Sequence, residues 1–203
     1  MNTHLLTGIV LGSVLLGGCN SWFPTPSPSD TSTRVLNEMK PFGLVEAPPT
    51  QPRKEIVTAR EDLYQVLQPE IAKGDVTIQE TEDRLIIMLA APMLFASGDD
   101  RLKPEGLHAL LQVSHVLKTR QAMHIRVEGH TDNVPIGKEL MKHFPTNMAL
   151  SQARATHAAH RLTDSGVTAR TMHMKGYADQ HPVASNTTEA GRQTNRRIEI
   201  IVS

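Results

Sequence analysis

Two helical patterns set among short strand patterns constrain the fold more than any other feature of this chain of 203 residues. The first pattern covers residues 104–118 and has Pro104 near its first turn, where proline is well tolerated. Its expected apolar face consists of Leu107, Leu110, Leu111, Val113 and Leu117. The second pattern covers about residues 147–164, and Gly166 is expected to end it. Its expected buried stripe consists of Ala155, Ala158 and Leu162.

Five strand patterns surround these helices. Their sequences are DVTIQE, DRLIIMLA, MHIRVEG, TMHMKGY and RRIEIIVS. In the third, Met123, Ile125 and Val127 alternate with polar residues and therefore face one way. From about residue 75 the predicted order is β-β-α-β-α-β-β. This order predicts an α/β sandwich with helices on one face of a mixed sheet, and roughly 130 residues suffice for a self-supporting core.

An extension of one helix and one strand, residues 54–83, is expected before the main domain at 84–203. Residues 54–72 carry apolar side chains at helical spacing, and Pro69 should end or bend this helix. The apolar positions are Ile56, Leu63, Val66 and Leu67.

The N-terminus resembles a bacterial lipoprotein signal at residues 1–18. An apolar run, Leu5 to Leu16, is too short to span a bilayer and is followed by LGGC, which resembles a lipobox. The resemblance implies lipidation of Cys19, the only cysteine. The alternative is a buried thiol after an ordinary signal. Asn20 in place of aspartate favours the outer membrane in lipoproteins of this kind, where several acyl chains give a firm anchor.

A proline-rich tether is expected to follow at residues 19–53. Serine and threonine are frequent among its prolines, which is typical of an extended linker. The more apolar piece within it, residues 34–46, could dock on a partner.

Composition excludes several classes of function. The formal net charge is +0, so nothing indicates a nucleic-acid partner. His157 and His160 share a helix face, but there is no HExxH or CxxC motif, so no metal site and no cofactor are predicted. No arrangement typical of a hydrolase stands out, and the chain is not expected to be an enzyme.

An acid and a base stand on either side of a long loop. Asp132 follows the strand pattern MHIRVEG, and Arg154 lies in the first turns of the second helix. Two interpretations are open: the two side chains form a structural salt bridge, or they bind a ligand that carries both charges.

Several motifs together resemble the OmpA-like peptidoglycan-binding domain shared by Pal, MotB and TssL. They are LFASG, RVEGHTDNVP, LSQARA, KGYADQHPVASN and GRQTNRRIEI, and they cover roughly residues 84–203. A narrower similarity to the C-terminal region of TssL-type proteins includes LYQVLQPEIAKGDVTIQETEDRLIIML.

The resemblance implies a ligand and two residues that bind it. The ligand is the diaminopimelate of the peptidoglycan stem peptide, whose free end holds an ammonium and a carboxylate on one carbon. In this family the acid of HTD takes the ammonium, which is Asp132 here, and the arginine of LSxxRA takes the carboxylate, which is Arg154 here. A guanidinium suits this role because it donates two parallel hydrogen bonds.

Four further residues are candidates for the same site, each with a simpler alternative. Thr131 contacts ligand or only makes a turn, and Asn147 contacts ligand or only caps the helix. Leu150 and Phe95 line the pocket or only pack in the core. Arg196 and Arg197 are expected to be solvated unless one of them supports the binding loop.

Three departures from the sequence pattern of the family bear on the affinity for peptidoglycan rather than on the fold. Ala96 stands where many relatives have aspartate, Met148 stands where tryptophan is common in TssL-like and MotB-like sequences, and the loop 133–146 is long.

The sequence therefore predicts an outer-membrane lipoprotein that binds peptidoglycan non-covalently from the periplasmic side. It would anchor an envelope-spanning secretion machine of type VI or type IVB, with secretion-system proteins as partners. The alternatives are a general Pal-like envelope tether and the targeting module of a cell-wall hydrolase.

Overall fold

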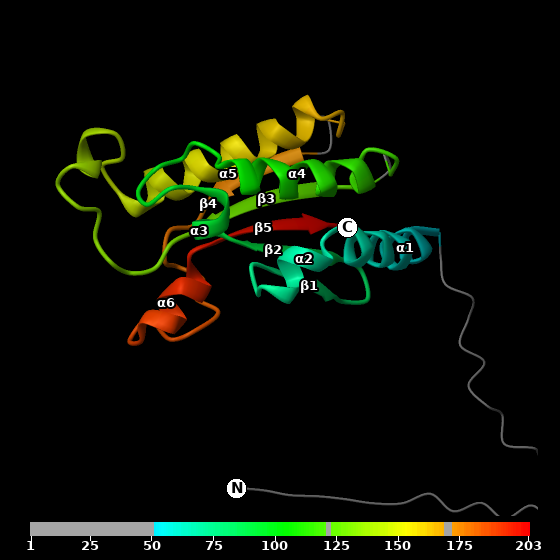
Figure 1. Ribbon diagram of the computed structural model, residues 1–203, viewed down its shortest axis with the longest axis horizontal. Coiled ribbons are helices and arrows are strands. Elements are labelled where there is room, and N and C mark those ends of the chain that lie inside the picture. Colours follow the sequence, from blue (N-terminus) through cyan, green and yellow to red (C-terminus); the bar gives the residue numbers. More distant parts are fainter. Residues whose placement is uncertain (1–50, 121–122, 169–171) are drawn as a thin grey trace, which may run out of the picture. The chain divides into compact units, whose positions relative to one another are not determined.

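The computed structural model describes residues 51–120, 123–168 and 172–203 (Figure 1). The predicted signal, Cys19 and nearly all of the predicted tether lie outside these ranges. Within them, no helix combines the length and the apolarity that a membrane crossing requires.

A five-stranded mixed sheet forms the centre of the described chain. Its strands are β1 (Val76–Glu80), β2 (Leu85–Ala90), β3 (Ile125–His130), β4 (Met172–Gly176) and β5 (Arg197–Val202). They lie side by side in the order β1-β2-β5-β3-β4, so the last strand runs along the middle of the sheet (Figure 1). Only β3 and β4 are parallel; the other neighbours are antiparallel.

Two long helices pack against each other and cover β3 and β4. Figure 1 shows α4 (Pro104–Leu117) beside α5 (Asn147–Asp164), and α5 lies along both strands. The remaining helices are α1 (Gln51–Val66), α2 (Gln68–Ala72), α3 (Ala91–Leu94), the 3₁₀ turn η1 (Leu140–Lys142) and α6 (Glu189–Asn195). The predicted order β-β-α-β-α-β-β and the mixed sheet are confirmed, with α3, η1 and α6 as additions.

One apolar core joins the sheet to α1, α3, α4 and α5. On β2, Leu85, Ile87 and Leu89 are fully buried and alternate with half-buried residues, as expected for a strand with one covered face. The predicted stripe of α5 is confirmed, since Ala155, Ala158 and Leu162 are all fully buried. The predicted extension shares this core through Leu63 and Leu67 of α1 and the α1–α2 junction.

Two details of the helices differ from the sequence prediction. Leu111 is 41% exposed, because it lies about 100° around the helix from Leu110, and Ala109 and Val116 complete the buried face instead. The expected polar loop before the last strand contains α6, which begins after Thr188. The hydroxyl of Thr188 accepts a hydrogen bond from Gly191 N.

The predicted break near Pro69 is confirmed, since α1 ends at Val66 and α2 begins at Gln68.

Glycines let α5 approach the ends of β3 and β4 closely. A Cβ on Gly129 would collide with the backbone carbonyl of Ser151, and a Cβ on Gly176 would collide with the backbone of Gln152. This close approach brings the start of α5 next to the loop that follows β3.

Candidate functional site

A cavity of about 640 Å³ opens where the loop after β3 meets α5 and α6. We call it the main cavity. All six residues predicted from the sequence line it: Phe95, Thr131, Asp132, Asn147, Leu150 and Arg154. Its other walls come from the turn 96–98, the loop 134–140 and α6. The fold therefore assembles residues that are up to 59 positions apart, from Phe95 to Arg154, around one space.

Arg154 is a buried cation that contacts no carboxylate of residues 51–120, 123–168 or 172–203. Its side chain is on the inner face of α5 and the residue is only 6% exposed. Its Nε donates to the carbonyl of Asp99 at 2.9 Å, and Nη2 reaches the carbonyl of Ala96 at 3.5 Å. Its guanidinium carbon lies 5.1 Å from the ring centre of Phe95. Burial lowers the pKa of Arg154 to about 10, although Asp100 and Asp99 oppose this, so the group stays charged at neutral pH.

Asp132 binds a different arginine from the one considered in the sequence. Its Oδ2 lies 2.5 Å from Nη1 of Arg196, and Oδ1 accepts from the backbone N of Val134 at 3.1 Å. Within the described ranges, no ion pair joins Asp132 to Arg154. The interpretation of these two residues as a structural salt bridge is therefore wrong.

Arg196 supports the binding loop, which is the alternative to a solvated side chain that the sequence left open. Its other terminal nitrogen lies 2.8 Å from Oε1 of Glu189, so it links the start of β5 to α6 and to the loop after β3. Burial alone would lower its pKa, but the hydrogen bonds to Glu189 and Asp132 outweigh this and raise it. The expected solvated state is wrong for Arg197 as well, which is 4% exposed and bound to Glu199.

The antiparallel pairing of β3 and β5 explains this contact. His130 lies opposite Arg197 in the register, so the residue before Arg197 falls beside the loop that begins after His130. The two consecutive arginines of RRIEI were the feature of the sequence that could have indicated this contact. Which acidic side chain they bind depends on the order of the strands in the sheet.

The two polar candidates hold the loop after β3 in place. Asn147 Nδ2 donates to the carbonyl of Val134 at 2.8 Å and reaches that of Asp132 at 3.4 Å. The helix cap is Thr146, whose hydroxyl accepts from Ala149 N, so the capping interpretation of Asn147 is wrong. Thr131 Oγ1 donates to the carbonyl of Asp132 at 2.9 Å, which fits a turn-making role.

The two apolar candidates are buried in the wall of the main cavity. Phe95 is 1% exposed and Leu150 is 5% exposed. Phe95 belongs to the continuous core and also contacts the guanidinium of Arg154. It therefore packs in the core and also helps to orient the side chain of Arg154. Ala96 contributes its carbonyl, and no side-chain carboxylate, to this wall.

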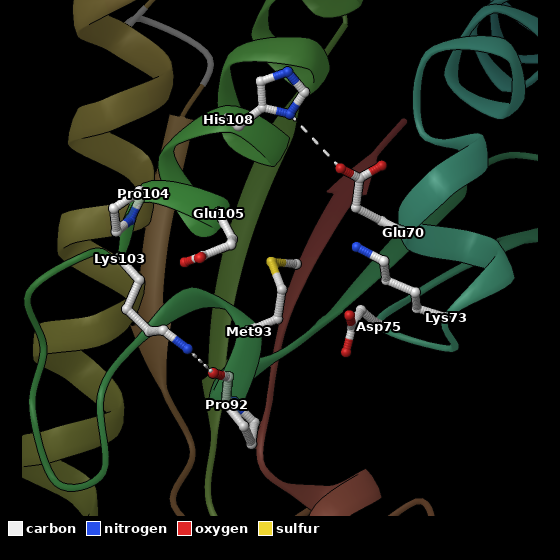
Figure 2. A pocket seen from close by; sticks show the side chains of 9 residues that line it. All are labelled: Glu70, Lys73, Asp75, Pro92, Met93, Lys103, Pro104, Glu105 and His108. Atoms are coloured by element: carbon white, nitrogen blue, oxygen red, sulfur yellow. Dashed lines mark hydrogen bonds and ion pairs between the residues drawn. The ribbon is translucent and has the colours of Figure 1, made fainter.

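A second cavity of about 620 Å³ lies between α2 and α4 (Figure 2). Figure 2 shows Glu70 and His108 facing each other across it, 3.6 Å apart, and Lys103 donating to the carbonyl of Pro92 at 3.0 Å. Glu70, His108 and Lys103 thus have partners across the opening or in its wall. None of the six predicted residues lines it.

The main cavity has no set of side chains suited to a metal ion. Its carboxylates, Asp132 and Glu189, are both bound to Arg196. His157, one of the histidines considered in the sequence, lies outside the cavity lining, and its Nδ1 is 2.8 Å from the carbonyl of Asp100. The main cavity can therefore bind a small group of mixed charge, with Arg154 for an anion and Asp132 for a cation.

Comparison with known proteins gives the family. Residues 94–196 match the model of the OmpA family. The chain belongs to the OmpA family. This match begins beside Phe95 and ends at Arg196, so it contains every lining residue of the main cavity except Ala91 and Pro92.

Three relatives place this OmpA-family chain among proteins of the cell envelope. The probable lipoprotein YiaD of Escherichia coli K12 is 35% identical over 63% of this chain and 55% of YiaD. The putative lipoprotein YfiB of the same strain is 31% identical over 100% of this chain and 99% of YfiB. The solved structure of the cell wall anchor of the type VI secretion system from Pseudomonas aeruginosa has a TM-score of 0.61 and 33% identity, covering 69% of this chain and 95% of that chain. The chain thus spans just over half the length of YiaD and nearly all of YfiB.

Proposed function

We propose that this chain is an envelope lipoprotein that binds peptidoglycan non-covalently, through the free end of diaminopimelate in the stem peptide. The observation that carries the proposal is Arg154: it is 6% exposed, lines a cavity and, among the described residues, is held by carbonyl oxygens and an aromatic ring rather than by a carboxylate. A buried charge ordinarily has an opposite charge as its partner. An anion from outside the chain would supply that partner.

The free end of diaminopimelate fits both sides of the main cavity. Its carboxylate would accept hydrogen bonds from Arg154, in the geometry that a guanidinium offers to two oxygens. Its ammonium would approach Asp132, whose carboxylate has about four lone-pair positions and uses two of them for Val134 N and Arg196. Glu189 would keep Arg196 in place while Asp132 is shared with the ligand.

The test compares two kinds of purified peptidoglycan. We expect the full chain to sediment with peptidoglycan that contains diaminopimelate and not with peptidoglycan that has lysine at the same position. Lysine offers the ammonium without the carboxylate, so the difference measures what Arg154 recognises. Equal binding to both polymers would refute recognition of the carboxylate.

Two variants and one control assign the binding to the main cavity. Asp132→Ala and Arg154→Lys should each lose at least tenfold in affinity, because one removes the cation partner and the other cannot form two parallel bonds. Arg161→Ala is the matched control, since Arg161 is on α5 but does not line the cavity. A loss of binding in Arg161→Ala of the same size would contradict the assignment.

The proposed role is a binder and not a hydrolase. The charged side chains that line the main cavity, Lys103, Asp132, Arg154, Glu189 and Arg196, each have a polar contact within the described residues. Release of soluble muropeptides from purified peptidoglycan by the full chain would favour the targeting module of a cell-wall hydrolase.

We further propose that the chain anchors a secretion machine of type VI or type IVB to the cell wall. The likeness to the cell wall anchor of the type VI secretion system of Pseudomonas aeruginosa supports this. The likeness to YiaD and YfiB supports a lipid anchor at Cys19, and with it the alternative of a general envelope tether. Cross-linking in the native host should capture membrane-complex proteins of the secretion system. Cross-links to peptidoglycan alone would favour the general tether.

A further inference from the structure

Three side chains of the kind that bind metal ions meet on the sheet, away from the lining of the main cavity. Glu128 and His130 belong to β3, and Glu199 belongs to β5. One ligand atom from each lies within 4.8 Å of the others. Within the described ranges this is the one such group. The two glutamates are directly opposite each other in the antiparallel register.

His130 is buried without a hydrogen bond. Its side chain is 2% exposed, and neither ring nitrogen has a hydrogen-bond partner. Its Nε2 lies 3.9 Å from Oε1 of Glu199, which is too far for a hydrogen bond. Tyr177 stacks on the ring with the centres 5.5 Å apart and holds its orientation. A buried polar group without a partner is costly and rare, and an ion between His130 and Glu199 would remove that cost.

The two glutamates place like charges opposite each other on β3 and β5. Like charges directly opposite each other on neighbouring strands are destabilising. Burial raises the pKa of Glu128, and the charge of Glu199 adds to this. Arg126 lies 3.3 Å from Oε1 of Glu128 and Arg197 lies 2.6 Å from Oε1 of Glu199, which offsets part of the repulsion. These contacts leave lone pairs on both carboxylates, because each has about four.

We propose that Glu128, His130 and Glu199 bind a divalent transition-metal cation, with Zn²⁺ as the best fit, that links β3 to β5. One imidazole nitrogen and two carboxylate oxygens supply three ligands, and a water supplies the fourth position of a tetrahedron. Nitrogen ligation favours Zn²⁺ and its neighbours over Mg²⁺ or Ca²⁺, which prefer oxygen alone. Metal–ligand distances of about 2.0–2.2 Å require the glutamates to turn inward by on the order of 1 Å.

Zinc titration of the full chain, purified in detergent without an affinity tag and stripped with a chelator, tests the proposal. We expect one saturable site by calorimetry and a melting temperature that rises with ZnCl₂. Glu128→Gln and Glu199→Gln should each lower the affinity for Zn²⁺ at least tenfold, because glutamine keeps the shape and removes the charge. The double variant His157→Asn and His160→Asn is the matched control and should bind Zn²⁺ as the unchanged chain does.

Cobalt provides a readout that does not depend on any variant. Co²⁺ bound to the unchanged chain should give a visible absorption band of a tetrahedral site with nitrogen and oxygen ligands. A sulfur-to-metal charge-transfer band would place the ion on Cys19 and overturn the proposal. The absence of saturable Zn²⁺ binding, or binding that survives both glutamine variants, would overturn it as well.

Discussion

Arg154→Met separates ligand binding from stability more sharply than any other change in the main cavity. Methionine has about the length of the arginine stem, is apolar, and can contact Phe95 through its sulfur. It removes the charge without opening a large cavity. We expect the variant to lose peptidoglycan binding and to keep most of its stability.

The magnitudes come from the surroundings of Arg154. The downward shift of the Arg154 pKa to about 10 corresponds to about 3 kcal/mol of destabilisation by the buried charge. The substitution removes this cost. It also loses the hydrogen bond to Asp99 O, worth about 1.5–3 kcal/mol for a charged donor, and about 0.5–2 kcal/mol of the contact with Phe95. The losses offset most or all of the gain, so the free energy of unfolding should rise by no more than about 1 kcal/mol and fall by no more than about 2 kcal/mol.

The measurement is melting temperature and peptidoglycan sedimentation on the same samples. For a domain of this size, 1 kcal/mol corresponds to about 2–4 °C. We therefore expect the melting temperature to fall by no more than about 8 °C relative to the unchanged chain, together with at least a tenfold loss of binding. A fall of about 15 °C would mean that Arg154 serves the fold, and retained binding would end the assignment of the carboxylate to Arg154.

Three further predictions concern other parts of the chain. Arg196→Ala should lower the free energy of unfolding by about 1–3 kcal/mol, because Asp132 is 7% exposed and loses its ion pair while the arginine itself is partly solvated; unchanged denaturant unfolding would show that the pair contributes nothing. Gly129→Ala should cost about 3 kcal/mol or more through its collision with Ser151, whereas Gly137→Ala, with open space around the added Cβ, should be nearly neutral; similar thermal melts for both would contradict the close packing. Cys19→Ser should abolish N-terminal acylation and release the protein from outer-membrane fractions, and mass spectrometry of an acylated variant would contradict lipidation at Cys19.

The order of helices and strands was predictable because each long element has a clear period. The alternation in MHIRVEG and the spacing of Ala155, Ala158 and Leu162 each indicate one element type, and the structure confirms them. Leu111 was assigned wrongly because an apolar side chain can lie at the edge of a buried face. The short helix α6 has no apolar period, so only its cap at Thr188 could have indicated it.

The sequence predicted which residues line the main cavity, but not which of their side chains pair with one another. Asp132 lies just after β3, and Arg154 lies on α5. Each therefore belongs to a motif next to the element that positions it. The pairing of Asp132 with Arg196 depends on β5 lying antiparallel next to β3. Many strand orders are compatible with the same succession of elements, and local sequence does not choose among them. The absence of a carboxylate partner for Arg154 within the described chain likewise follows only from three-dimensional distances.

The central place of β5 determines when the sheet can close. β5 lies between β2 and β3, so the pairs β1–β2 and β3–β4 share no ladder with each other until β5 is inserted. A chain that leaves a ribosome or an export channel N-terminus first delivers β5 as the last of the five strands. Until then it holds two half-sheets with unpaired edges, and contacts across such sequence distances form slowly. The order of the strands thus means that the five-stranded sheet cannot form as one ladder until β5 is available.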